Sequence, residues 1–224
     1  MTPGRLLVFE GPEGAGKTTQ IARLAAALGT AGVPYLVARE PGGTPPGEQI
    51  RTLLLDSAEE LAPATEALLF LASRAEHVAR VIRPALAAGR LVIADRFFLS
   101  TYAYQIAGRG LPEETVRAAN ALAIGDLRPD LTVLLVHRAT EGLARADRRG
   151  ARDRIERAGD AFHERVAEAF ELFATRAWQR DHPESGPIVG IDASGTPDEV
   201  YDRLFAVLTE QWPETFPVGR GSDR

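Results

Sequence analysis

One segment near the N-terminus restricts the possible folds more than any other part of this 224-residue chain. It matches the pattern GxxxxGK[ST] and reads Gly11-Pro12-Glu13-Gly14-Ala15-Gly16-Lys17-Thr18. The apolar run at residues 5–10 before it is typical of a strand, and residues 18–28 after it have the spacing of a helix. A glycine-rich loop between a strand and a helix is the setting in which this pattern binds nucleotide phosphates. The sequence therefore predicts a nucleotide site rather than an ordinary glycine-rich turn.

The residue types in this loop suit phosphate chemistry. Glycines allow backbone N–H groups to turn toward phosphate oxygens, and the N-terminus of the following helix adds partial positive charge. Lys17, the only lysine in the chain, can reach the β- and γ-phosphates, and the Thr18 hydroxyl can ligate Mg²⁺. We expect the nucleotide to be held by Gly11, Pro12, Glu13, Gly14, Ala15, Gly16, Lys17, Thr18 and Thr19.

Strands and helices alternate along the rest of the chain. Apolar runs predict strands at residues 35–38, 91–95, 131–136 and 187–191. Helices are predicted over residues 64–88, from 139, near 158–180 and over 197–212, and the Pro/Gly cluster at residues 39–48 is predicted to be a loop. We therefore expect a three-layer α/β fold of the P-loop NTPase type, with a central five-stranded parallel sheet. It forms a single domain over residues 1–212, followed by a flexible C-terminal tail over residues 213–224.

Composition excludes several classes of function. The net charge of −5 and the pI near 5.5 argue against a protein that coats nucleic acid, because that binding needs a basic surface. Cysteine is absent, which excludes disulfides and thiolate catalysis, and the four histidines lack metal-ligand spacing. A DxxG switch and an NKxD-like base reader are absent from suitable places, which argues against a GTPase. No apolar run is long enough for a signal peptide or a membrane span, so we expect a soluble, cytoplasmic protein.

Five blocks of the sequence stand in the order found in a known enzyme family. They are FEGPEGAGKTT at residues 9–19, REPGGT at 39–44, DRFFLSTYAYQ at 95–105, RPDLT at 128–132 and DRIE at 153–156. Together they resemble the bacterial thymidylate kinases along nearly the whole chain. The sequence departs from the family pattern at Phe97, where tyrosine or histidine is usual, and at Val136, where aspartate is usual. The resemblance implies a P-loop nucleoside monophosphate kinase that uses ATP and Mg²⁺ to phosphorylate dTMP.

The resemblance implies roles for residues of the acceptor site. Glu13 would approach the sugar 3′-hydroxyl of dTMP, which explains a carboxylate inside a loop that otherwise faces phosphates. Phe70 would stack on the thymine ring and Arg74 would bond the base edge, and these two residues share a face because they are one helical turn apart. From the sequence alone, Phe70 fits the role of an ordinary core aromatic equally well.

Three arginines are candidates to hold the acceptor phosphate, because a guanidinium can bond two oxygens at once. They are Arg39, Arg51 and Arg96. A lone arginine is more often a surface charge, but Arg96 follows a buried strand at the carboxyl edge of the sheet, where ligands of such folds bind. Asp95 ends the same strand, and we expect it either to orient water on Mg²⁺ or to fix Arg96.

The segment after Arg96 is predicted to be helical and to line the substrate. Ser100, Thr101, Tyr104 and Gln105 are the substrate-binding candidates on it. Gln105 resembles the residue that reads the base edge, and Tyr104 resembles the residue that packs under the sugar where a ribose 2′-hydroxyl would project. The resemblance also suggests a cis bond between Glu40 and Pro41.

An arginine-rich segment at residues 145–157 is predicted to be a mobile lid. The phosphate-binding loop has no arginine of its own, so the transferring phosphoryl group needs a cation besides Lys17. We expect Arg149, Arg152 and Arg154 to supply it, which makes them catalytic residues together with Lys17 and Arg96. The alternative interpretation of such an arginine-rich segment is a solvent-exposed helix end without a catalytic role.

The expected reaction is direct in-line transfer, ATP + dTMP → ADP + dTDP, in which positioning and charge neutralisation supply the rate. The resemblance also implies a homodimer formed through the helix at residues 64–88. Two alternatives remain open. One is another nucleoside monophosphate or deoxynucleoside kinase, and the other is an ATP-binding regulator with the same loop and no acceptor.

Overall fold

A parallel sheet forms the centre of the molecule. The structure, a computed structural model, describes residues 4–136 and 153–216. All neighbouring strands pair in parallel, in the order β2-β3-β1-β4-β5. Their bounds are β1 Arg5–Glu10, β2 Tyr35–Arg39, β3 Leu91–Asp95, β4 Leu131–Val136 and β5 Ile188–Asp192. The predicted five-stranded parallel sheet is confirmed.

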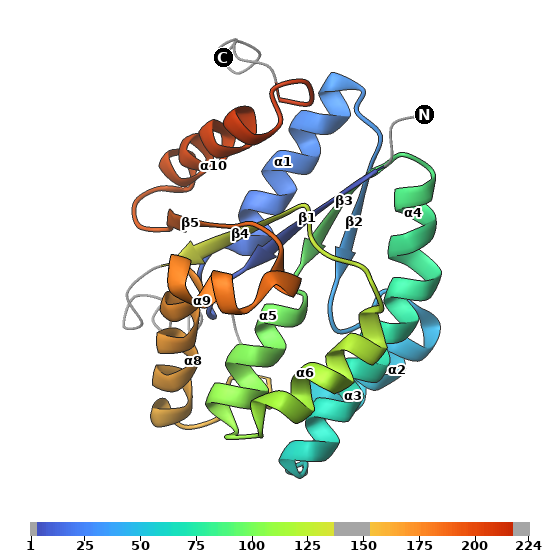
Figure 1. The fold of residues 1–224 in the computed structure, drawn as a ribbon, viewed down its shortest axis with the longest axis vertical. Coiled ribbons are helices and arrows are strands. Elements are labelled where there is room, and N and C mark those ends of the chain that lie inside the picture. The colour runs from blue at the N-terminus through green and yellow to red at the C-terminus, as the bar shows by residue number, and fades with distance from the viewer. Residues whose placement is uncertain (1–3, 137–152, 217–224) are drawn as a thin grey trace.

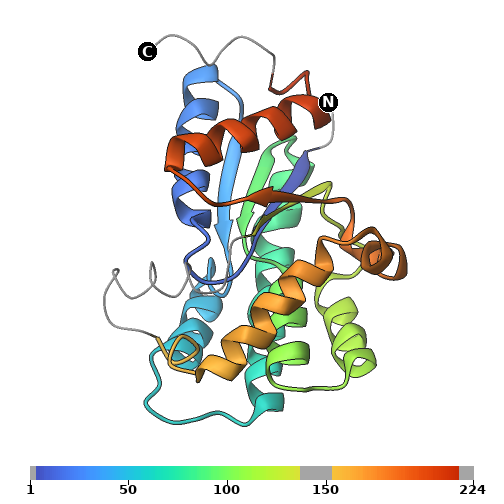
Figure 2. The same ribbon diagram turned by 90° about the vertical axis from the view of Figure 1, so that its left-hand side faces the viewer.

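Helices cover both faces of this sheet (Figures 1 and 2). The first face carries α1 (Lys17–Ala31) and α10 (Pro197–Gln211). On the side of the second face lie α3 (Pro63–His77), α4 (Arg83–Ala87), α5 (Phe98–Thr101), α6 (Glu113–Ile124) and α8 (Asp160–Phe173), with π-helical stretches η1 (Val78–Ile82) and η2 (Tyr102–Gly108). The shorter α9 (Arg176–Asp181) and the 3₁₀ turn η3 (Pro183–Ser185) follow α8. Within the described residues, no helix is both long and apolar enough to span a bilayer.

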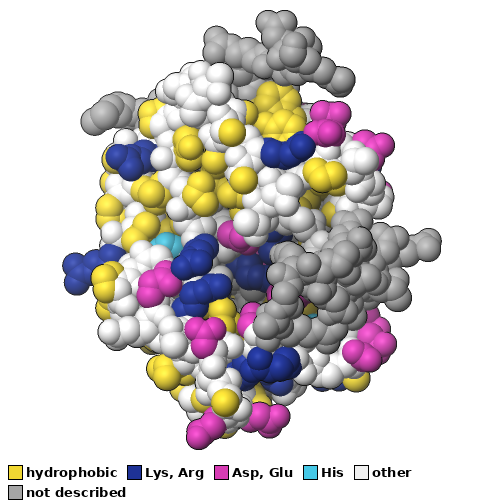
Figure 3. Space-filling view, turned by 180° about the vertical axis from the view of Figure 1, so that it is seen from behind, with side chains coloured by type: hydrophobic (Ala, Val, Ile, Leu, Met, Phe, Trp, Pro, Cys, Tyr) yellow, Lys and Arg dark blue, Asp and Glu magenta, His cyan; other side chains and the backbone are white. Residues whose placement is uncertain are grey.

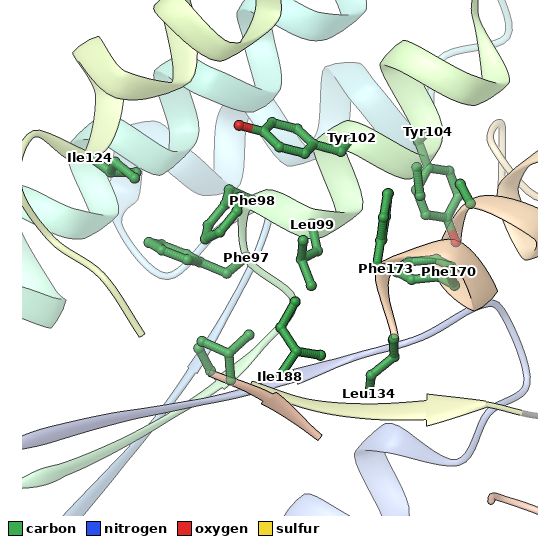
Figure 4. Close-up of a cluster of buried hydrophobic side chains, with 14 of the residues drawn as sticks. Phe97, Phe98, Leu99, Tyr102, Tyr104, Ile124, Leu134, Phe170, Phe173 and Ile188 are labelled. Carbon is green, nitrogen blue, oxygen red and sulfur yellow. The ribbon is translucent and has the colours of Figure 1, made fainter. Parts of the chain in front are cut away.

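Alternation along the strands explains the two layers, because successive strand side chains point to opposite faces. In β1, Leu7 and Phe9 join the core under α1 and α10, whereas Leu6 and Val8 join the core on the other face. Figure 4 shows the second core, in which aromatic side chains from α5, η2 and α8 lie over Leu134 of the sheet. Both faces of the inner strands β1, β3 and β4 are therefore buried, which explains their continuous apolar runs.

The loop predicted over residues 39–48 is wrong from Pro45 onward, where α2 (Pro45–Leu55) begins. The Thr44 hydroxyl caps this helix by accepting a hydrogen bond of 3.0 Å from the backbone N–H of Gly47. Pro45 and Pro46 occupy the first turn, where a backbone N–H has no partner within the helix. The prolines that suggest a loop therefore mark a helix start. Helix α6 was not expected from the sequence, and the helix expected near residues 158–180 is divided into α8 and α9.

The C-terminal part of the described chain packs on the domain as far as residue 216. Phe216 is buried, and its backbone N–H donates to the Trp212 carbonyl at 2.9 Å. Phe216, which lies in the segment predicted as a flexible tail, thus belongs to the core beside α1 and α10. Residues 217–224 and the helix expected from residue 139 lie outside the described residues.

Candidate active site

The phosphate-binding loop joins β1 to α1 at the carboxyl edge of the sheet. Gly11 has a φ of 140°, and a Cβ there would lie 2.3 Å from the carbonyl oxygen of Leu135, so only glycine fits. The Lys17 ammonium donates to the carbonyl oxygens of Gly11 and Pro12, at 2.8 and 2.9 Å. Burial, with a smaller effect from the Arg96 guanidinium, lowers the pKa of Lys17 to about 8. The lysine therefore lies folded against the loop, poised between its charged and neutral forms.

A cavity of about 330 Å³ lies beside this loop, and its wall brings together residues that are far apart in the sequence. Figure 3 shows the corresponding hollow, with basic side chains around it. The wall contains sixteen of the predicted site residues: Glu13, Gly14, Ala15, Gly16, Lys17, Thr18, Arg39, Arg51, Phe70, Arg74, Asp95, Arg96, Ser100, Thr101, Tyr104 and Gln105.

Arg96 lies at the centre of the cavity wall in a strained backbone conformation. Its φ is 70°, which is unusual for a bulky residue, and its backbone N–H is held by the Phe9 carbonyl at 2.9 Å. The guanidinium donates to Ser100 at 3.0 Å, to Tyr104 at 3.1 Å and to the Glu13 carboxylate. The Tyr104 hydroxyl also donates to Glu13 at 3.0 Å. The strain aims the arginine at the loop, and three side chains fix it there.

A buried carboxylate that the sequence analysis missed supports this turn. Glu10 is fully buried and accepts hydrogen bonds from the backbone N–H groups of Phe97 and Ser100, at 2.8 and 3.0 Å, and from the Ser100 hydroxyl at 2.6 Å. Burial raises the pKa of Glu10 above its usual range, although Arg96 opposes the effect. An acidic residue that ends an otherwise apolar strand is the signal that could have identified it.

Asp95 lies next to the phosphate loop, as expected. The Thr18 hydroxyl donates to the Asp95 carboxylate at 3.2 Å. Mg²⁺ in nucleotide sites takes few protein ligands and is completed by phosphate and water oxygens, so a hydroxyl and a carboxylate at this spacing fit it. Among residues 4–136 and 153–216, no group of three or more His, Cys, Asp or Glu could hold a metal without such help.

The cavity wall also contains an aromatic ring and a buried arginine. Phe70 is partly buried, packs against the hydrophobic core and lines the cavity. The Arg74 side chain is 2% exposed, and its guanidinium lies 5.4 Å from the centroid of the Phe97 ring. Its N–H groups donate to Glu40 (2.7 Å), Thr101 (2.8 Å), Asn120 (2.8 Å) and the Phe97 carbonyl (2.9 Å). The unusual phenylalanine at position 97 thus packs against Arg74.

Arg39 and Arg51 lie at the rim of the cavity. Arg39 is exposed and pairs with the Glu48 carboxylate at 3.0 Å, and Arg51 donates to the Pro41 carbonyl at 2.9 Å. The bond between Glu40 and Pro41 is cis, as the family resemblance suggests. Both rim arginines remain within reach of a ligand in the cavity, because they line it.

The predicted lid is described only in part. Arg149 and Arg152 lie outside the described residues. Arg154 lies outside the wall of the main cavity: it is buried, donates to the Leu54 carbonyl at 2.7 Å and pairs with the Glu66 carboxylate at 2.7 Å. The catalytic role of all three arginines stays a prediction. The same turn adds three residues to the cavity wall: Asp153, Ile155 and Glu156.

A second cavity, of about 300 Å³, lies on the other side of the phosphate loop. It shares Gly14, Ala15, Gly16 and Thr18 with the main cavity and is completed by Thr19 and by Ala193, Gly195 and Pro197 after β5. A nucleotide with its phosphates on the loop can therefore extend into this cavity while a second ligand occupies the main one.

Two further carboxylates, which were not predicted from the sequence as site residues, contact residues of the predicted site. Glu40 pairs with Arg74, and Glu66 bonds Gln105 at 3.0 Å. Glu66, Phe70 and Arg74 are spaced by four residues and so share one face of α3. That spacing is the signal that could have added Glu66, whereas nothing local in the sequence connects Glu40 to Arg74.

The chain is similar to proteins of one family along most of its length. The family model described as Thymidylate kinase matches residues 9–180. Thymidylate kinase from Thermomicrobium roseum is 52% identical over 207 residues, which cover 91% of this chain and 94% of that protein. Thymidylate kinase from Deinococcus radiodurans is 46% identical over 211 residues, covering 94% and 99% of the two chains. Thymidylate kinase from Pseudomonas fluorescens is 51% identical over 208 residues, covering 92% and 96%.

Proposed function

The chain belongs to the thymidylate kinase family, and we propose that its two cavities hold ATP and dTMP with their phosphates meeting on the phosphate loop. The enzyme transfers the γ-phosphoryl group of ATP to dTMP and releases ADP and dTDP. The observation that carries the assignment of the sites is that the cavities share four residues of the loop and otherwise have separate walls.

The donor nucleotide lies along the loop and α1. Backbone N–H groups of the loop point toward the phosphates, and the N-terminus of α1 adds its partial charge. Lys17 leaves the carbonyl oxygens of Gly11 and Pro12 and bonds phosphate oxygens instead, as its position at the helix start allows. The adenosine part occupies the second cavity beside Thr19 and Gly195.

The acceptor nucleotide occupies the main cavity. The thymine ring stacks on Phe70, with Arg74 and Gln105 at its edge, and Tyr104 packs under the sugar. Glu13 accepts a hydrogen bond from the 3′-hydroxyl, and Arg39, Arg51 and Arg96 hold the phosphate. Ser100 and Thr101 support this wall through their bonds to Arg96 and Arg74. The basic groups thus lie where the acceptor phosphate meets the loop.

Mg²⁺ would be held by Thr18, with Asp95 next to it, and when bound it neutralises charge on the phosphate oxygens. Transfer needs no protein nucleophile, because positioning and charge neutralisation supply the rate. Lys17 and Arg96 neutralise charge from the protein side. Arg149, Arg152 and Arg154 of the lid add positive charge when the lid closes and excludes water.

We also propose that the enzyme is a cytoplasmic homodimer. Leu68 on α3 is 62% exposed, and Leu122 on the neighbouring α6 is 88% exposed. Large apolar side chains exposed on adjacent helices favour an interface between copies. Light scattering after size-exclusion chromatography should give a dimer for the natural chain and a monomer for Leu68→Glu, and a monomeric natural chain would contradict the proposal.

Steady-state assays with a panel of acceptors test the proposed sites. ADP release should need an acceptor and should be fastest with dTMP among dTMP, dCMP, dGMP and deoxythymidine. Lys17→Ala should lose transfer while its circular dichroism stays that of the natural chain, because the hydrogen bonds of the Lys17 ammonium go to carbonyl oxygens of its own loop. ATP hydrolysis that no nucleotide changes would indicate a regulator, and a better acceptor than dTMP would indicate a different kinase.

A further inference from the structure

Glu66 is a fully buried carboxylate that the reaction does not use. Its Oε1 atom accepts from Gln105 Nε2 at 3.0 Å and from Arg109 Nε at 3.1 Å. Its Oε2 atom accepts from Arg109 Nη2 at 3.0 Å and pairs with Arg154 Nη2 at 2.7 Å. Burial alone would raise the pKa of Glu66, but the hydrogen bonds from Arg109 and Arg154 outweigh burial and hold this pKa below its usual range. Glu66 is therefore ionised at neutral pH.

An ionised carboxylate can only accept hydrogen bonds, and this decides the orientation of the Gln105 side chain. The amide nitrogen must face Glu66, because the amide oxygen there would place two acceptors in contact. The Gln105 Oε1 atom is then directed away from Glu66, and none of the described residues donates a hydrogen bond to it. Gln105 lines the main cavity together with Phe70 and Arg74. An oriented acceptor thus lies at the base end of the cavity.

We propose that Glu66 is a positioning residue for base selection: by holding the Gln105 amide nitrogen, it fixes Oε1 as an acceptor for the N3–H group of the pyrimidine. The inference rests on the proposed function, because it places the base of the acceptor nucleotide beside Gln105. It assigns to Glu66, which does not line the cavity, a control over which base is accepted.

Arg74 completes the pattern on the same edge of the base. Four of its five N–H groups donate to protein atoms, and the fifth has no partner among the described residues. A donor from Arg74 and an acceptor from Gln105 match O4 and N3–H of thymine. Cytosine offers an amino group and an unprotonated N3 instead, so a donor would meet a donor and an acceptor would meet an acceptor.

A glutamine without such an anchor would discriminate poorly. The amide can rotate by half a turn and offer its N–H group instead of its oxygen, and this N–H group would donate to the N3 atom of cytosine. Rotation in this protein would turn Oε1 toward the Glu66 carboxylate and leave the buried anion without one of its donors. Glu66 therefore opposes the rotation of the Gln105 amide that would allow cytosine to bind.

Isothermal titration of dTMP and dCMP into the natural chain and four variants of it tests the role of Glu66. Glu66→Gln keeps the shape of the side chain but can donate to a rotated Gln105, so the ratio of the dCMP Kd to the dTMP Kd should fall about tenfold or more. Arg109→Gln is the matched control: it removes another partner of Glu66 but keeps the bond to Gln105, so the ratio should stay at the natural value. In Gln105→Met, adding Glu66→Gln should change the ratio no further.

An unchanged ratio in folded Glu66→Gln would overturn the proposal, and so would an equal fall in Arg109→Gln, which would indicate general loosening. If Glu66→Gln does not fold, a crystal structure of the natural chain with dTMP gives the answer. Gln105 should then contact both N3 and Glu66, and loss of the Glu66 contact on binding would overturn the proposal. Turnover is measured in a separate assay. If the chain binds dTMP selectively but does not phosphorylate it, the proposed function is contradicted while the role of Glu66 in base selection is still supported.

Discussion

Raising the pH from 7 to 9 is expected to weaken ATP binding, because it removes the proton from Lys17. Burial, and secondly Arg96, lower the pKa of this lysine to about 8 in the free protein. With this pKa, the ammonium is about 90% protonated at pH 7, about 50% at pH 8 and about 10% at pH 9. ATP phosphates next to Lys17 favour the charged form, so the lysine in the complex stays protonated over this range.

The size of the effect follows from those fractions. If ATP binds only the protonated form, its apparent affinity falls about tenfold between pH 7 and pH 9, or about 1.4 kcal/mol. Binding also takes up a proton, about 0.1 per site at pH 7 and about 0.9 at pH 9. The stability of the free protein changes in the opposite direction. Above about pH 8, Lys17 keeps its proton in the unfolded chain but loses it in the folded protein. The free energy of unfolding therefore increases as the pH rises from about 8 toward the ordinary pKa of lysine.

Calorimetry of ATP binding with excess Mg²⁺ measures both quantities, because titrations in two buffers of different ionisation enthalpy give the number of protons taken up. Lys17→Ala is the control, in which the proton uptake and the pH dependence should both disappear. An affinity that stays constant from pH 7 to pH 9 in the natural chain, with no proton uptake at pH 8.5, would refute a half-neutral lysine in the free loop.

Five other substitutions test the proposed site and the proposed lid. Tyr104→Ala should narrow the gap in kcat/KM between dTMP and its ribose analogue, because the ring occupies the space of a 2′-hydroxyl, and an unchanged ratio would place sugar selection elsewhere. Asp95→Asn should raise the Mg²⁺ concentration needed for half-maximal activity, whereas an unchanged Mg²⁺ dependence would leave Asp95 only the role of fixing Arg96. Alanine at Arg149, Arg152 or Arg154 should lower kcat, by on the order of 10³-fold for the arginine that contacts the transferring phosphoryl group. The same substitutions should have a much smaller effect on the Kd for dTMP. Natural kcat in all three would contradict a catalytic lid.

Much of the fold could be predicted because its signals are local. Strands buried on both faces leave continuous apolar runs, and the phosphate loop is a contiguous pattern between two such elements. Asp95 and Arg96 lie at the carboxyl end of β3. Because the carboxyl ends of parallel strands meet at one edge of the sheet, their place near the phosphate loop could be predicted from the sequence. The start of α2 was missed because the same prolines that end helices also begin them, and only the Thr44 cap separates the two cases.

The supporting contacts of the site could not be predicted in the same way. Arg74 is a residue of the cavity wall, but its partners Glu40 and Asn120 lie 34 and 46 residues away in the sequence. Only tertiary packing decides which buried carboxylate meets which arginine. The same holds for the lowered pKa of Lys17, which depends on burial and on Arg96 rather than on the loop sequence.

A crystal structure with dTMP, Mg²⁺ and a non-hydrolysable ATP analogue tests the central claim most directly, namely that the two nucleotides occupy separate cavities that meet at the phosphate loop. We expect the thymine ring on Phe70, the dTMP phosphate beside Arg96, and the γ-phosphate of the analogue between that phosphate and Lys17. A dTMP molecule bound in the second cavity, or one whose phosphate lies away from Arg96 and the loop, would contradict it.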